Sequence, residues 1–325
     1  MDYLFEDYLN WSSQLERALR NEVLDAETLD LNSLRGIAFI GMGGSGIVGD
    51  MVSKYLEKTI EIPIITVKNF YPPKCVGKNW LAITLSYSGE TLETIIAFRE
   101  VVKRGAKTSV IASGGQLLAV AEELKIPRIT VEKGHVPRSA LPALLAGTVK
   151  LLGSLLNLNL NVERGVEVLK DQTALKVSEE LASSLYSRFP VFVVTEDLYP
   201  LGLRAKNEFN ENSKVLCKVE VLPEWGHNDI VGWEEMRRDW LRPVLFKDGP
   251  STLIDFAADY FRGLGYDPKI IDVGKSGYLE TMLFGSWIVG LSSIILAKLR
   301  KVDPGETKPI RLYKAFLEGS FKGRM

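Results

Sequence analysis

Residues 36–46 read GIAFIGMGGSG, and residues 80–91 read WLAITLSYSGET. In both stretches a short apolar run ends in a loop rich in glycine or hydroxyl groups, and a helical segment follows. The further apolar runs IPIITV (62–67), TSVIA (108–112) and PRITV (127–131) also alternate with helical segments. Short runs rich in Ile and Val between helices are typical of βαβ units, whose parallel sheet is buried on both faces. The first half of the chain is therefore predicted to be an α/β sandwich.

The second half of the chain repeats this plan. Strands are predicted at PVFVVT (190–195), KVEVL (218–222), RPVLFK (242–247) and PKIIDV (268–273). The two halves match in pattern and barely in sequence, so we predict an α/β protein of two αβα sandwich subdomains, each with a mainly parallel sheet flanked by helices. A chain of 325 residues also exceeds the size of one usual core. We place the N-terminal domain at residues 1–155 and the C-terminal domain at residues 156–325.

Helices are predicted between and around these strands. One covers residues 2–20, a second covers 139–157 with Ser139 as its cap, and a polar amphipathic one covers 163–187 between the halves. A long helix at about 276–300 and a last one at about 309–319 finish the chain.

The segment TMLFGSWIVGLSSIILAKL (281–299) approaches the length of a membrane span, and its only charge is Lys298. Glycine and serine dilute its apolar character, and no second span is present. We therefore predict a long helix buried between domains or subunits of a soluble protein.

Composition indicates which classes of partner and which cellular compartment to expect. Forty basic residues stand against forty-one acidic ones, which gives no electrostatic footprint for nucleic acid or an anionic membrane. Cys75 and Cys217 lie far apart, so a disulfide framework is excluded and a cytoplasmic location is expected. His135 and His227 have no metal-ligand spacing, and the N-terminus lacks the features of a signal peptide.

The glycine-rich loop GMGGSG fits G-x-G-x-x-G at Gly41, Gly43 and Gly46. That pattern is typical of dinucleotide-binding sites. Such a site normally has an acidic residue at the end of the second strand. Here that strand ends in Val67 and Lys68, and Lys68 can face a ribose phosphate. A nicotinamide-dependent oxidoreductase therefore remains an alternative.

The loop SYSGET, called the hydroxyl loop below, is more informative. Ser86, Ser88 and Thr91 surround Gly89 where a buried strand ends and a helix begins, which suits a phosphate dianion held by hydroxyl and backbone N–H donors. The alternative is an ordinary helix cap, since Ser and Thr are common at that position. Glu90 is an unfavourable neighbour for phosphate unless its carboxylate points away or meets a basic group.

The two loops are expected at adjacent carboxyl ends of one sheet, where parallel sheets bind ligands. This arrangement can place a sugar between them. Gly44 and Ser45 of the glycine-rich loop would then contact the sugar.

These motifs carry a family resemblance. GMGGSG after the first strand, with S-x-S-G-x-T about forty residues later, resembles the sugar isomerase (SIS) domain. NEFNENSK (207–214), PEWGHND (223–229) and the lysine of LYKAF extend the match to essentially the whole chain. Together they resemble the bifunctional phosphoglucose/phosphomannose isomerases, found mainly in archaea. The resemblance implies an aldose–ketose isomerase acting on glucose 6-phosphate and fructose 6-phosphate, and also on mannose 6-phosphate, without cofactor or metal.

The resemblance also implies roles for individual residues. Glu211 is the base that carries the proton, and Arg138 lies beside the reacting carbons. His227 and Lys314 serve ring opening, and Thr307 stands where the bifunctional members carry threonine. Ser86, Ser88 and Thr91 bind the sugar phosphate, with Gly44 and Ser45 near the sugar. In this superfamily the histidine reaches the partner subunit's site, which implies a homodimer.

Without the resemblance, the residues leave two questions open. Glu208 and Glu211 share a face of one predicted helix, so either carboxylate can be the base. A non-catalytic phosphosugar-binding regulator would keep the hydroxyl loop and would not need Glu211, His227 and Lys314. The absence of a nucleic-acid-binding segment makes that alternative weaker.

Overall fold

The computed structural model describes residues 2–236 and 238–321. Contacts divide the chain into two compact units. The four-stranded unit comprises Met1–Trp11 and Glu167–Glu306, and the six-stranded unit comprises Ser12–Val166 and Thr307–Met325. Each terminal segment therefore packs with the opposite half of the chain. The division at residues 155 and 156 stays a prediction about domains in sequence order.

The sheet of the six-stranded unit has the strand order β1-β6-β5-β4-β2-β3. Only the pairing of β1 with β6 is antiparallel. The five strands predicted from apolar runs are confirmed, with ends shifted by up to two residues. The strands are β1 (Val23–Leu24), β2 (Gly36–Ile40), β3 (Ile64–Val67), β4 (Trp80–Leu85), β5 (Lys107–Ala112) and β6 (Arg128–Thr130).

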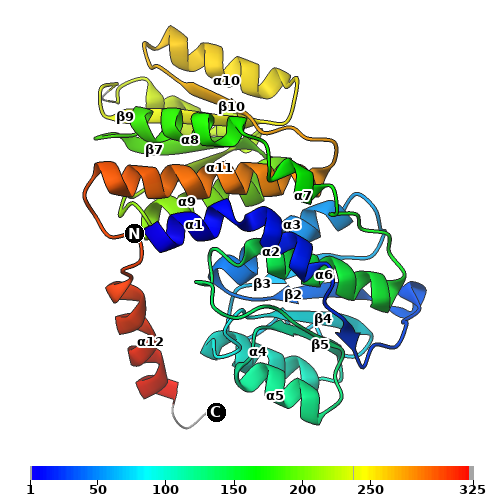
Figure 1. Ribbon diagram of the computed structural model, residues 1–325. Coiled ribbons are helices and arrows are strands. Elements are labelled where there is room, and N and C mark those ends of the chain that lie inside the picture. Colours follow the sequence, from blue (N-terminus) through cyan, green and yellow to red (C-terminus); the bar gives the residue numbers. More distant parts are fainter. Residues whose placement is uncertain (1, 237, 322–325) are drawn as a thin grey trace. The chain divides into compact units, whose positions relative to one another are not determined.

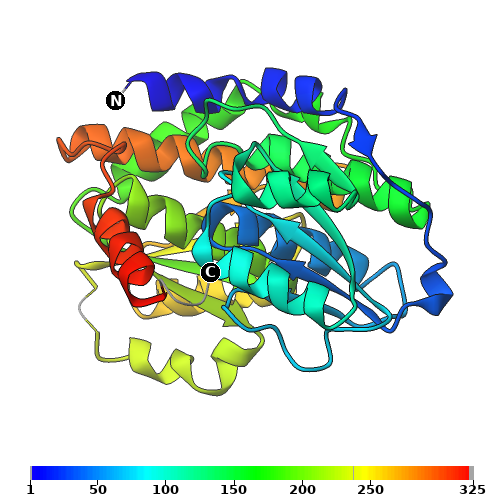
Figure 2. The same cartoon turned by 90° about the horizontal axis from the view of Figure 1, so that it is seen from below.

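Helices cover both faces of this sheet. Every residue of β2 and β4 is therefore buried. On one face lie α3 (Gly43–Leu56) and α6 (Leu141–Leu156), and on the other lie α4 (Leu92–Lys103) and α5 (Gly115–Glu123) (Figures 1 and 2). The short 3-10 turn η1 (Leu31–Ser33) precedes β2.

The C-terminal helix α12 (Lys308–Phe321) packs on α4 in the same unit. Leu317 forms a buried cluster with Leu92 and Ile96, and Phe321 stacks on Phe70 at 4.8 Å between ring centroids. Since α4 begins at the hydroxyl loop, this packing ties the last helix to the helix that follows that loop.

The four-stranded sheet is parallel throughout, in the order β10-β9-β7-β8. The first four parallel strands of the six-stranded sheet, β2 to β5, have the same 2-1-3-4 order. The two halves thus share one topology, as their repeated pattern predicted. The strands are β7 (Phe189–Thr195), β8 (Lys218–Leu222), β9 (Leu241–Lys247) and β10 (Lys269–Asp272).

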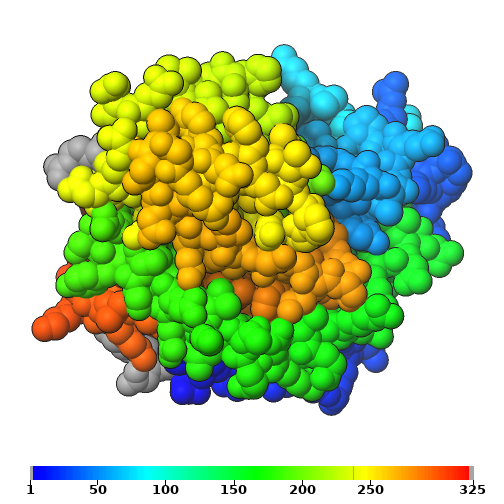
Figure 3. All heavy atoms as spheres, turned by 90° about the horizontal axis from the view of Figure 1, so that it is seen from above, coloured from blue at the N-terminus to red at the C-terminus, as the bar shows by residue number. Residues whose placement is uncertain are grey.

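Helix α10 (Thr252–Gly263) covers one face of this sheet and forms part of its outward surface (Figure 3). Helices α8 (Thr173–Ser184) and α9 (Tyr199–Glu211) cover the other face (Figure 1). Three 3-10 turns complete the unit: η2 (Glu196–Leu198), η3 (Glu224–His227) and η4 (Asp229–Trp233).

Helix α11 (Tyr278–Leu299) is long and apolar enough to cross a membrane, but 83% of its apolar window is buried inside the structure. It packs against α8 and α9, and α1 (Asp2–Leu9) lies against it. The Trp287 indole N–H donates to the Tyr8 carbonyl at 2.8 Å. The predicted burial is confirmed, and the helices named here belong to the same unit as α11. A location between domains or subunits stays a prediction.

Three details differ from the sequence-based expectations. The helix expected at residues 2–20 is two helices, α1 and α2 (Trp11–Ala18), and the one at 163–187 is divided into α7 (Gly165–Val168) and α8. Ser139 does not cap α6: its hydroxyl donates to the Val136 carbonyl at 3.0 Å, which closes the preceding turn.

Candidate functional site

The glycine-rich loop and the hydroxyl loop follow β2 and β4, which are adjacent in the sheet. With β3 on the far side of β2, the chain direction across the sheet reverses between β2 and β4, and such a reversal is the usual ligand site of an open α/β sheet. The Tyr87 backbone N–H donates to the Ser45 hydroxyl at 3.1 Å. The two loops are therefore bonded to each other at the expected position.

The hydroxyl loop is not an ordinary helix cap. Thr91 occupies the N-cap position of α4, yet its side chain makes no capping hydrogen bond. The Ser86 hydroxyl donates to the Thr91 hydroxyl at 3.2 Å and accepts from the Gly89 N–H at 3.2 Å. The Ser88 hydroxyl accepts from the Glu90 N–H at 3.2 Å. The first turn of α4 thus keeps N–H donors that no cap side chain uses, which favours an anionic ligand.

The equivalent loop of the other unit provides an internal comparison. After β9, Ser251 is the N-cap of α10, and its hydroxyl accepts from the Ile254 N–H at 3.4 Å. A carboxylate, Asp255, stands in the first turn of that helix. There the helix end is capped in the ordinary way, so of these two strand-to-helix loops only the hydroxyl loop has the features of a phosphate site.

The Glu90 carboxylate has a hydrogen-bond donor outside its own loop. It accepts from the Gln116 N–H at 2.8 Å, in the first turn of α5. Gly89, with φ of 70°, lies so close to Gly114 that an added Cβ would come within 1.9 Å of the Gly114 carbonyl oxygen. The carboxylate therefore accepts a hydrogen bond from the start of a second helix, α5.

Arg138 is buried, with 7% of its surface exposed, in the loop of residues 131–140 that follows β6, called the arginine loop below. This loop lies directly on Gly44, where an added Cβ would be 3.0 Å from the Pro137 carbonyl oxygen and 3.3 Å from the Arg138 Cα. The glycine at position 44 thus allows the arginine loop to approach the glycine-rich loop.

Lys68 is engaged by its own unit. Its ammonium pairs with Asp50, and burial raises the pKa of that carboxyl group although the lysine opposes the shift. The Lys68 side chain also covers Gly46, where an added Cβ would be 3.1 Å from the Lys68 Cε. These contacts weigh against the ribose-phosphate role that the sequence left open for Lys68.

Thr307 and Lys314 belong to the same unit as the hydroxyl loop. The Thr307 carbonyl accepts from the Ile310 and Arg311 N–H groups at the start of α12. Lys314 lies on the exposed part of α12, the helix that packs on α4.

Glu211 is the last residue of α9 and is half-buried, whereas Glu208, one turn earlier, is 1% exposed. Both Glu208 carboxylate oxygens accept from the Tyr8 hydroxyl, at 2.8 and 2.7 Å. The Asn212 amide donates to the same carboxylate at 2.6 Å, and Arg204 forms an ion pair with it. Glu208 is therefore committed to the core, and of the two glutamates only Glu211 has exposed surface.

His227 is exposed at the end of η3, and within residues 2–236 and 238–321 nothing forms a hydrogen bond or ion pair with its side chain. Trp225, two residues earlier, is buried in a cluster with Trp233 and Phe261. The turn η3 is thus anchored by Trp225 and leaves the imidazole exposed.

The ten candidate residues fall in two groups. The six-stranded unit holds Gly44, Ser45, Ser86, Ser88, Thr91, Arg138, Thr307 and Lys314, and the four-stranded unit holds Glu211 and His227. Sequence reasoning did not identify Tyr87, whose signal was its place between two hydroxyl residues. Among the residues that the structure describes, no group of three His, Cys, Asp or Glu side chains is arranged to hold a metal ion.

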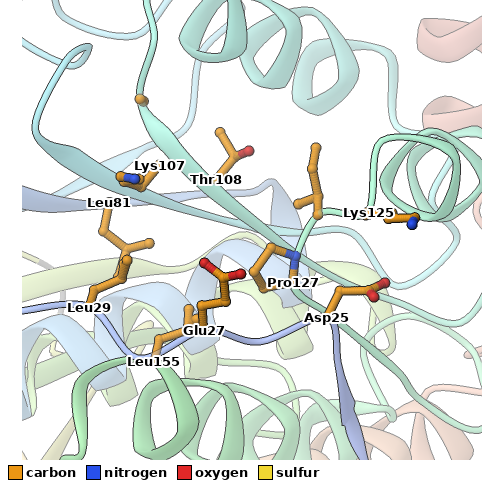
Figure 4. Close-up of a pocket in the computed structure, with 11 residues that line it drawn as sticks. Asp25, Glu27, Leu29, Leu81, Lys107, Thr108, Lys125, Pro127 and Leu155 are labelled. Atoms are coloured by element: carbon orange, nitrogen blue, oxygen red, sulfur yellow. The ribbon is translucent and has the colours of Figure 1, made fainter.

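A cavity of about 320 Å³ lies at the other end of the six-stranded sheet (Figure 4). Leu81, Lys107 and Pro127 in its wall stand at the amino ends of β4, β5 and β6. It is therefore separate from the loops described above, which follow the carboxyl ends of the strands.

Comparisons with known proteins agree with this geometry. The C-terminal domain of glucosamine-fructose-6-phosphate aminotransferase from Francisella tularensis superposes with a TM-score of 0.71 at 15% identity, covering 94% of this chain and 98% of that one. Fold and loops together define a sugar isomerase (SIS) type α/β protein. The family model described as "Bacterial phospho-glucose isomerase C-terminal SIS domain" matches residues 175–317.

A bifunctional phosphoglucose/phosphomannose isomerase from Aquifex aeolicus is 32% identical over 89% of this chain and 92% of its own. A D-glucosamine-6-phosphate 4-epimerase from Sulfolobus acidocaldarius is 29% identical over 93% of this chain and 94% of its own. The chain belongs to the family of the bifunctional phosphoglucose/phosphomannose isomerases, and it is an isomerase.

Proposed function

We propose that this protein interconverts glucose 6-phosphate and fructose 6-phosphate, and also accepts mannose 6-phosphate, by proton transfer through a cis-enediol. The observation that carries the proposal is the hydroxyl loop. In a chain of this family, three hydroxyls and an uncapped helix start lie where parallel sheets bind ligands. A sugar phosphate held there presents its other end to the glycine-rich loop, at Gly44 and Ser45.

The proposed chemistry needs one base and one stabilising charge. Glu211 removes the proton from one carbon and returns it to the next, and Arg138 stabilises the enediolate. Ring opening needs an acid and a base, for which we propose His227 and Lys314. Thr307, at the start of the helix that carries Lys314, is proposed to contact the substrate. The buried network around Glu208 supports the choice of Glu211, because it leaves Glu208 no free carboxylate oxygen.

We further propose that the protein works as a homodimer in the cytoplasm, in glycolysis and gluconeogenesis, with His227 reaching the partner subunit's site. The exposed imidazole on an anchored turn supports this arrangement, because its own unit offers it no side-chain partner among the described residues. No nucleic acid or membrane is part of the proposal. Sedimentation of the wild-type protein and of the His227→Ala variant measures the oligomeric state of each. It therefore tests the dimer separately from the chemistry.

The decisive test incubates the purified protein with fructose 6-phosphate in heavy water containing a chelator. Deuterium at C2 of the aldose products, glucose 6-phosphate and mannose 6-phosphate, is the expected result. A parallel incubation with glucosamine 6-phosphate measures epimerisation at C4, the reaction named for the Sulfolobus relative. Turnover of glucosamine 6-phosphate without turnover of fructose 6-phosphate would overturn the proposal. Binding of fructose 6-phosphate without turnover would favour the non-catalytic regulator instead.

The variant Glu211→Gln tests the base. Its turnover should fall about 10²–10⁴-fold, or ~3–5 kcal/mol of barrier, while competitive inhibition by inorganic phosphate is retained. Near-normal turnover would show that another group moves the proton.

A further inference from the structure

Tyr87 lies between Ser86 and Ser88 of the hydroxyl loop. Its side chain is buried and forms hydrogen bonds with the arginine loop, which carries Arg138. We propose that Tyr87 is a positioning residue that holds Arg138 in register with the phosphate site. The inference rests on the proposed function, since it assigns Arg138 to the reacting carbons.

The Tyr87 hydroxyl makes both contacts with one loop. It donates to the Glu132 carbonyl at 3.0 Å and accepts from the His135 N–H at 2.9 Å. The Tyr87 side chain is 6% exposed, so water offers no ready substitute for either bond. The hydroxyl thus fixes the backbone of residues 132–135, three residues before Arg138.

The backbone of Tyr87 is held at the same time. Its N–H donates to the Ser45 hydroxyl at 3.1 Å, and its carbonyl accepts from the Ser113 N–H at 2.8 Å and the Ser113 hydroxyl at 2.7 Å. One residue therefore connects the glycine-rich loop, the hydroxyl loop, the turn after β5 and the arginine loop.

The arginine loop has a separate support on its other side. The Gln14 amide donates to the Ser139 carbonyl at 3.2 Å and accepts from the Ala143 N–H at 3.3 Å. Removing the Tyr87 hydroxyl should therefore loosen the side of the loop nearest the phosphate site without detaching the loop from α2. Ser86, Ser88 and Thr91 keep their own hydrogen bonds, since none of these involves the phenol.

The expected effect of Tyr87→Phe is a separation of chemistry from binding. Its kcat should fall about 10- to 100-fold, because small displacements of a catalytic group are costly in rate. The inhibition constant of inorganic phosphate should change by no more than about twofold, because the phosphate grip itself is intact.

A double-mutant cycle with Arg138→Ala shows through which residue Tyr87 acts. If Tyr87 acts through Arg138, Tyr87→Phe should cost no more than about twofold further in kcat/KM in the Arg138→Ala background. Tyr278→Phe is the control, because it also removes a phenol that donates to a backbone carbonyl, that of Asp197 at 3.0 Å, which lies outside the arginine loop and the turn with His227. Its kcat should remain near that of the wild type.

Several results would overturn the inference. They are an unchanged kcat in Tyr87→Phe, an equal loss in both backgrounds, or a loss of phosphate inhibition that matches the loss of rate. If the variant does not fold, amide exchange of the wild type decides: a His135 amide that exchanges as fast as a free one removes the proposed bond. A wild-type enzyme without isomerase activity would instead refute the proposed function and leave this hydrogen bond measurable.

Discussion

Replacing Glu208 by Gln tests whether this glutamate has a structural or a catalytic role. Arg204 and Glu208 are each 1% exposed and form an ion pair, with the Tyr8 hydroxyl and the Asn212 amide on the same carboxylate. Glu208→Gln keeps the shape and removes the charge, which takes from the buried Arg204 guanidinium the carboxylate that it pairs with. Breaking a buried pair from one side costs about 3–5 kcal/mol of unfolding free energy.

The size of this effect can be measured in the four-stranded unit. Five of the six tryptophans, namely Trp11, Trp225, Trp233, Trp240 and Trp287, belong to it, so tryptophan fluorescence during urea unfolding reports mainly on that unit. Glu167→Gln is the control: its carboxylate pairs with Lys170 but is 76% exposed, so its loss should cost about 0–1 kcal/mol.

Activity completes the test. At 25 °C, with rates corrected for the folded fraction, Glu208→Gln should keep its kcat within about tenfold of the wild type, a barrier change of ~1.4 kcal/mol at most. The reasoning is refuted if kcat falls about 10²–10⁴-fold while the unfolding free energy stays within ~1 kcal/mol of the wild type. Glu208 would then be the base, and the core network would be a poor guide to its role.

Three further changes have definite expected outcomes. Gly44→Val should lower kcat at least ~10-fold with an unchanged circular dichroism spectrum, because its side chain would push the arginine loop from its place. Glu90→Ala should raise the KM for fructose 6-phosphate by about 3- to 10-fold through loss of its bond to the first turn of α5, and Glu90→Gln, whose amide oxygen still accepts, should restore it. Burial raises the pKa of the Cys217 thiol to about 12, so a thiol reagent at pH 8 should modify only the exposed Cys75 in the native protein and both cysteines in urea. Two reactive thiols in the native state would contradict that assignment.

The elements that sequence reasoning located are those with a local signal. The apolar runs that became β2 and β4 are buried along their whole length, and each ends at the loop whose composition marked it. Where the sequence-based expectations failed, a local hydrogen bond competed. The Ser139 hydroxyl closes its own turn with the Val136 carbonyl, and Asp171 accepts from the Thr173 N–H at 3.0 Å where one long helix was expected.

Sequence by itself determined the α/β class, the place of the hydroxyl loop and the burial of the long apolar helix α11. These features depend on periodicity and loop composition over a few neighbouring residues. Only the tertiary structure decided that Glu208 belongs to the core, because the phenol that binds it lies 200 positions away in the chain. The hydrogen-bond partner of Glu90 and the packing of each terminal segment with the opposite half were decided in the same way. Such contacts depend on which distant side chains come together when the sheets and helices pack. A local sequence pattern does not contain that information.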